Sequence, residues 1–128
     1  MDSEATAHPQ EANVEPKVIR AHQFILEDGN GKTRAVLDVG KDGVPGFYLY
    51  DENATPRAML GVTNHGAMLA LCDKNGKTVA SLAVSNDGTS LRLADDNGKP
   101  RVRVEVGKDG VPGMTLFYAN GVKLWSKP

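Results

Sequence analysis

The chain has 128 residues, a length that suits one domain. It carries 15 Lys and Arg residues against 16 Asp and Glu residues, and both signs are interspersed, which argues against nucleic acid or an anionic membrane surface as a partner. The one cysteine, Cys72, excludes an intramolecular disulfide and favours a reducing compartment.

The N-terminal segment, residues 1–17, has no periodic apolar pattern and contains Pro9, Pro16 and scattered acidic residues. Such a segment buries too little to offset its ordering entropy, so we expect a disordered or partner-docking tail, followed by a β-repeat domain over residues 18–128. The chain shows neither a secretory signal nor 18 consecutive apolar residues. We therefore expect a soluble, cytoplasmic protein without membrane insertion, and a viral or phage origin is also compatible with these features.

From residue 18 onward, short runs of alternating apolar residues are separated by clusters of Gly, Asn and Asp, which is typical of short β-strands. A pattern of apolar residue, any residue and leucine recurs, with spacings of 23, 22, 22 and 23 residues between its marker leucines. The markers are Leu26, Leu49, Leu71, Leu93 and Leu116. The spacing predicts about five two-stranded repeats of 22–23 residues.

A second strand follows each of the first four markers, at residues 34–39, 57–62, 79–84 and 101–106. Its alternate positions are Ala or Val, then Leu or Val, then Val, while the intervening positions vary from apolar to charged. This alternation predicts strands with one buried face and one exposed face.

The turns within the repeats have sequences such as DGNGK and DKNGK, in which Asp accepts a backbone N–H and Asn-Gly supplies left-handed positions. They predict tight hairpins between antiparallel neighbours. Ala54 stands where the other copies have Gly, and Pro56 follows it, so we expect a different turn geometry there.

Short strands at this spacing predict an all-β fold: a sandwich, a barrel, a propeller, or a β-spiral, solenoid-like or meander arrangement. Each repeat offers few inward side chains, and a lone ten-stranded meander would leave two open edges and a thin apolar face in water. We therefore expect closure or oligomerisation.

The order of strand, Asx-Gly turn, strand and Gly/Pro-containing loop, with small alternating aliphatic residues, resembles the repeats of triple β-spiral fibre shafts over residues 24–125. The resemblance implies three chains wound about a common axis and a rigid trimeric stalk or assembly element. A β-prism or a propeller completed by several chains predicts much the same sequence.

No residue set predicts catalysis, a cofactor or a metal site. The four Asp-x-Asn pairs lack the remaining ligands of a calcium loop, and three lysines stand close by. His8, His22 and His65 have no ligand partners at zinc spacing. Cys72 has no base nearby in sequence and is interpreted as a small packing residue.

The candidate interaction surface consists of aromatic residues and of arginines that recur at one strand position. Its members are Tyr48, Tyr50, Phe117, Tyr118, Trp125, Arg34, Arg57 and Arg101. The aromatic residues suit sugar stacking, subunit contacts or the capping of open ends. The arginines suit pairing with acidic groups on a neighbouring strand or chain.

Two hypotheses about function follow. The first is a non-catalytic structural module that self-associates, as a homotrimer, and scaffolds a fibre, filament or larger protein complex together with another protein. The alternative is a carbohydrate- or receptor-binding β protein that uses the aromatic residues.

Overall fold

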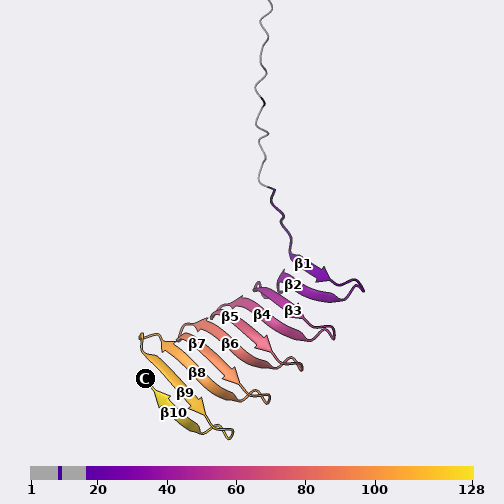
Figure 1. Cartoon of the computed structure of the whole chain (residues 1–128). Coiled ribbons are helices and arrows are strands. Elements are labelled where there is room, and N and C mark those ends of the chain that lie inside the picture. The colour runs from indigo at the N-terminus through magenta and orange to yellow at the C-terminus, as the bar shows by residue number, and fades with distance from the viewer. Residues whose placement is uncertain (1–8, 10–16) are drawn as a thin grey trace, which may run out of the picture.

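The structure is a computed structural model that describes Pro9 and residues 17–128. Most of the predicted tail, residues 1–8 and 10–16, therefore lies outside the described residues. Ten strands form one antiparallel sheet in the order β1 to β10, each strand bonded to the next along the chain (Figure 1). The strands are β1 (Gln23–Glu27), β2 (Thr33–Val39), β3 (Pro45–Tyr50), β4 (Pro56–Thr63), β5 (Gly66–Cys72), β6 (Thr78–Ser85), β7 (Gly88–Ala94), β8 (Pro100–Gly107), β9 (Pro112–Phe117) and β10 (Lys123–Lys127).

This topology confirms the all-β prediction and selects an open meander among the predicted architectures. β1 and β10 do not pair with each other, so the sheet does not close into a barrel within one chain. The described part of the chain forms a single twisted layer with nothing packed on either face (Figure 1).

The turns on one long side of the sheet share a set of backbone hydrogen bonds. In the turn between β1 and β2, the amide of Asp28 donates to the carbonyl of Lys32 at 2.9 Å, and the amide of Gly31 donates to the carbonyl of Asp28 at 2.9 Å. Gly31 has a φ of 75°, a left-handed value at which glycine has no steric penalty. A register shift follows at the strand end, between Leu26 and Glu27, as expected for a hairpin with a bulge.

The turn that contains Ala54 has the same geometry, so the prediction of a different one was wrong. The amide of Asp51 donates to the carbonyl of Thr55 at 3.0 Å, and Ala54 takes the left-handed position with a φ of 61°. Ala54 is the one non-glycine residue with a positive φ in the described chain. The ladders of β3 and β4 on both sides of the turn fix its length, and Ala54 accepts the strained conformation.

The predicted burial of one strand face does not occur within the single chain. In the described chain the buried apolar residues are Ala35, Ala70 and Cys72, and no large side chain is fully buried. A single layer provides no second layer against which side chains on either face can pack. The sequence alternation correctly predicts which residues share the apolar face of each strand, but no other part of the described chain packs against that face.

Candidate interaction surface

One face of the sheet carries an apolar surface that continues across nearly all strands, which we call the apolar face. The cross-strand register aligns its side chains in three rows. The leucine–alanine row lies next to the turns that join β1 to β2, β3 to β4, β5 to β6, β7 to β8 and β9 to β10, of which the first four begin with Asp. It consists of Leu26, Ala35, Leu49, Ala58, Leu71, Ala80, Leu93, Val102 and Leu116. The central row consists of Phe24, Leu37, Phe47, Leu60, Leu69, Leu82, Leu91, Val104 and Met114.

The third row, the valine row, lies next to the turns on the opposite long side. It consists of Val39, Pro45, Val62, Ala67, Val84, Thr89, Val106 and Pro112. From β2 to β9 the three rows contain one polar side chain, Thr89, and no charged one. The apolar face therefore has the composition of a protein core rather than of a protein surface.

The large side chains of this face are about half exposed, although the sequence pattern predicts them to be core. Met114 is 38% exposed, Leu71 48%, Val84 52% and Leu26 64%. Ala35 is 7% exposed because it lies low between its larger neighbours in the row, Leu26 and Leu49. The leucine–alanine row is thus a series of projecting leucines with depressions between them.

The opposite face, the mixed face, is covered in part by its own long side chains. The ring of Tyr48 lies over Gly46, where an added Cβ would be 2.6 Å from the ring. This contact explains why glycine occupies this strand position: the ring covers Gly46 and leaves no room for a side chain there. The Sγ atom of Cys72 lies 3.7 Å from the Oγ1 atom of Thr78, in keeping with a packing role.

The predicted arginines lie on this sheet beside the Asp-containing turns and pair with an aspartate of the adjoining turn. The distances are 3.4 Å from Arg34 Nη1 to Asp28 Oδ2, 3.5 Å from Arg57 Nη1 to Asp51 Oδ2, and 2.9 Å from Arg101 Nε to Asp95 Oδ2. Two of them also reach the following strand, because Arg34 Nε donates to the Tyr50 carbonyl at 3.3 Å and Arg57 Nε to the Cys72 carbonyl at 3.1 Å. These contacts tie neighbouring strands within one chain.

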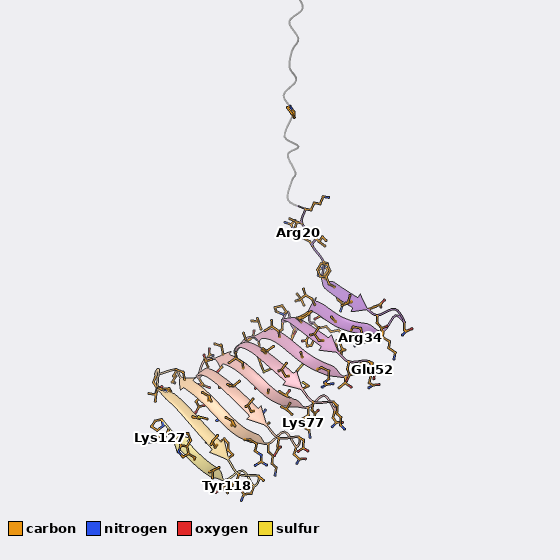
Figure 2. All side chains as sticks on the ribbon, in the orientation of Figure 1. Arg20, Arg34, Glu52, Lys77, Tyr118 and Lys127 are labelled. Atoms are coloured by element: carbon orange, nitrogen blue, oxygen red, sulfur yellow. The ribbon has the colours of Figure 1, made fainter. Side chains whose placement is uncertain are left out.

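The turns themselves are linked along that long side, where Figure 2 shows Glu52, Lys77 and Tyr118 in succession. Lys32 Nζ donates to the carbonyl of Glu52 at 3.2 Å, and Lys77 Nζ donates to the carbonyl of Asp96 at 3.1 Å. Lysines that stand near the turn aspartates thus connect successive turns.

Each turn aspartate accepts backbone hydrogen bonds inside its own turn. Oδ1 of Asp73 accepts the amides of Asn75 at 2.8 Å and Lys77 at 2.9 Å. These bonds favour the charged carboxylate, and the bond from Lys77 is the main reason why the pKa of Asp73 lies below its ordinary value of 3.8. The Asp-x-Asn pattern therefore reflects turn capping.

The other three turn aspartates follow the same rule. The amide of Asn30 lowers the pKa of Asp28, and the amide of Thr55 lowers that of Asp51. At Asp95 partial burial acts to raise the pKa, but the hydrogen bonds from the amides of Lys99 and Asn97, together with the charge and hydrogen bond of Arg101, outweigh it and the pKa is lowered. Among the residues that the structure describes, no group of three or more His, Cys, Asp or Glu side chains could hold a metal ion.

The predicted aromatic residues are divided between the two faces. Tyr48, Tyr50 and Phe117 lie on the mixed face, and Tyr118 lies exposed in the last turn. Trp125 pairs with Leu116 and so lies on the apolar face, 43% exposed. Phe117 and Trp125, which are close in sequence, therefore do not belong to one continuous patch.

Hollows on the described surface are shallow. A cavity volume of about 420 Å³ opens between neighbouring turns and is lined by Lys32, Thr33, Glu52, Asn53 and Ala54. It contains no convergent set of acid, base and nucleophile. No helix capable of crossing a membrane is present in the described residues.

Sequence reasoning assigned the surface residues with the greatest apolar area to a core and so omitted them from the candidate site. The signal that could have identified this surface was the alternation itself, because all the alternating segments of the described residues belong to one sheet and none is left to form a second layer. No protein-family model matches this chain, and no curated protein sequence matches it.

Proposed function

We propose that this protein is a non-catalytic structural module whose copies self-associate as a homotrimer through their apolar faces. The trimer scaffolds a fibre, filament or larger complex, and residues 1–17 dock on another protein. One observation carries the proposal: a face with the composition of a core lies uncovered in the described chain.

The amount of apolar surface supports an interface. Half-exposed side chains of this size, distributed over ten strands, leave on the order of 1,000 Å² of apolar area in water, whereas the largest patch of a typical monomer covers about 300–600 Å². A stable interface buries about 800 Å² on each partner. The apolar face is thus large enough to be an interface and too large for an ordinary solvated surface.

Another copy of the chain is the partner that fits this face best. The occupant must present a ladder of apolar side chains as long as the eight strands β2 to β9, without charges, at the spacing of a β-sheet. The chain itself supplies such a ladder, and sheets pack face to face when their apolar sides meet. Association of copies also explains how a chain whose described residues form no internal core can fold.

The width of the sheet favours three copies. Strands such as β3, with six residues, and β4, with eight, span about 20–25 Å, and the side chains of one sheet fill about 5 Å, half the spacing of packed sheets. Three sheets about 20 Å wide, arranged as a triangular prism, leave about 6 Å between each sheet and the axis. Four such sheets would leave about 10 Å and an empty channel.

The two outer rows favour three sheets over two. The leucine–alanine row and the valine row are as apolar as the central row, with large exposed members such as Leu71 and Val84. A two-layered sandwich leaves both long sides open beside these rows. In a prism, the long side of each sheet meets the next sheet, and all three rows lose contact with water.

The two terminal strands suit a role in a longer assembly. β1 and β10 each have one unpaired side in the described sheet. An unpaired edge is a template for another strand, so trimers joined end to end, or capped by a partner, would satisfy these backbone groups.

A pair of adjacent residues on β6 tests the proposal. Leu82→Lys places a charge in the central row, and Ser81→Lys places the same charge on the mixed face. Sedimentation velocity should show loss of the trimer or of the fold for Leu82→Lys and an unchanged trimer for Ser81→Lys. A Leu82→Lys protein with the sedimentation coefficient and circular dichroism spectrum of the unmodified chain would refute the proposal.

A further inference from the structure

The outer rows of the apolar face alternate in size, and the two alternations are out of phase. In the leucine–alanine row, odd-numbered strands carry leucine, as in Leu49 and Leu71, and even-numbered strands carry a smaller residue, as in Ala58. In the valine row the order is reversed, because even-numbered strands carry valine, as in Val62, and odd-numbered strands carry smaller side chains, as in Ala67.

We propose that the copies pack parallel and level with one another, the leucine–alanine row of one copy against the valine row of the next. The inference rests on the proposed self-association and specifies its geometry. The same strand of each copy then lies at the same height along the common axis, and the three copies of β1 gather at one end of the assembly.

In this arrangement large side chains meet small ones at nearly every level. At the height of β4, the depression at Ala58 receives Val62 of the next copy, and at the height of β5, Leu71 projects over Ala67 of the next copy. The pattern continues at β2 and β6, where Ala35 meets Val39 and Ala80 meets Val84. β8 is the exception, since both rows carry valine there.

A shift by one strand would destroy this fit, because leucine would meet valine on one pair of strands and alanine would meet alanine, threonine or proline on the next. The first clash overpacks the interface and the second leaves a cavity, and both destabilise close-packed apolar contacts. The alternation therefore encodes register as well as attraction.

The main competing geometry is a dimer of two sheets with reversed strand order, in which β4 of one copy faces β7 of the other. There the leucine–alanine row meets itself, and Ala58 faces Leu93 of the partner copy rather than Val62. The two geometries make different predictions for the same substitution.

The test is a set of exchanges at Ala58. Ala58→Leu fills the depression and should lower the thermal midpoint of the assembly by about 5 °C or more. Adding Val62→Ala to Ala58→Leu should recover at least half of the lost thermal midpoint. The single variant Val62→Ala is the fourth member of this double-mutant cycle. The two residues are four positions apart on β4, about 13 Å, so within one chain their effects should simply add.

The matched control is Ala58→Leu with Leu93→Ala, which should give no restoration. A second exchange on an odd strand, Leu71→Ala with Ala67→Leu, should restore stability in the same way as the exchange on β4. Three results would overturn the level packing. They are a recovery of the thermal midpoint with Leu93→Ala, a recovery with neither Val62→Ala nor Leu93→Ala, and an unchanged thermal midpoint in Ala58→Leu. A single-chain mass of the unmodified protein in sedimentation would instead overturn the self-association itself, so the two failures are distinct.

Discussion

The amide nitrogen of Ala54 lies 3.1 Å from the carbonyl oxygen of Asp51, and this hydrogen bond holds Ala54 at a φ of 61°. The corresponding turns achieve the same closure with glycine, as at Gly31 with a φ of 75°. An alanine in this conformation carries a steric penalty of about 1 kcal/mol.

Ala54→Gly should therefore stabilise the protein by about 1 kcal/mol, since it removes that penalty without altering a hydrogen bond. The matched control is Gly31→Ala, where no atom lies within 4 Å of the added Cβ and only the conformational penalty acts, so it should destabilise by a similar amount. Chemical denaturation of both variants measures the effect. A destabilised Ala54→Gly protein would contradict the assignment of strain to this turn.

Gly88 offers a harsher comparison. A Cβ at Gly88 would collide with the carbonyl oxygen of Val106, whereas a Cβ at Gly110 would meet no atom within 4 Å, although both glycines have positive φ. Gly110→Ala should cost about 1 kcal/mol from backbone conformation alone, as for Gly31→Ala, and Gly88→Ala should cost at least twice as much because β7 and β8 must separate. Equal losses in denaturant titrations would show that the two strands do not approach each other as described.

The turn aspartates predict how stability depends on pH. Their pKa values in the folded chain lie below 3.8, so the unfolded chain binds protons more readily as the solution becomes acidic. The stabilisation they supply is present above about pH 4 and is lost as the pH falls through the lowered values of the folded state. Thermal midpoints measured from pH 7 to pH 2 should therefore decline once the pH falls below about 4.

The fourfold variant with Asp28, Asp51, Asp73 and Asp95 replaced by Asn serves as its control. Asparagine retains an oxygen that accepts the turn amides but does not titrate. The decline of the thermal midpoint in acid should be shallower in this variant. An equally steep decline would assign the acid sensitivity to other carboxyl groups.

Cys72 should react slowly with thiol reagents. It is 6% exposed on the mixed face, so modification of the folded chain requires local opening and should be about 100-fold slower than modification of the unfolded chain. A cysteine placed in the exposed turn at Asn75, with Cys72 replaced by Ser, supplies the fast reference. Equal rates at the two positions would contradict the packing role of Cys72.

Much of the fold follows from the sequence because the information is local. The alternation over residues 57–62 and 79–84 predicts strands that the structure extends by one residue at each end, to Pro56–Thr63 and Thr78–Ser85. The Asp and Gly positions predict the hairpins between antiparallel neighbours, and the structure shows that each strand pairs with the next in chain order.

The remaining features depend on relations between distant groups. The alternation of residues 79–84 predicts that Leu82 lies on the apolar face. Whether that face is buried depends on a second layer, which can come from another chain and is not encoded in the local sequence. The separation of Phe117 from Trp125 depends on the register shift between Lys123 and Trp125, which pairs Trp125 with Leu116 on the apolar face. Ala54 was misread because residue type alone does not reveal that the flanking ladder imposes the turn.

The central claim is that the apolar faces of three copies are buried against one another. The most direct measurement is the solution mass of the full chain by light scattering on a size-exclusion column, over a range of concentrations and repeated without residues 1–17. We predict the mass of three chains, retained without that segment. A mass of one chain at all concentrations, with the circular dichroism of a folded β protein, would contradict the account.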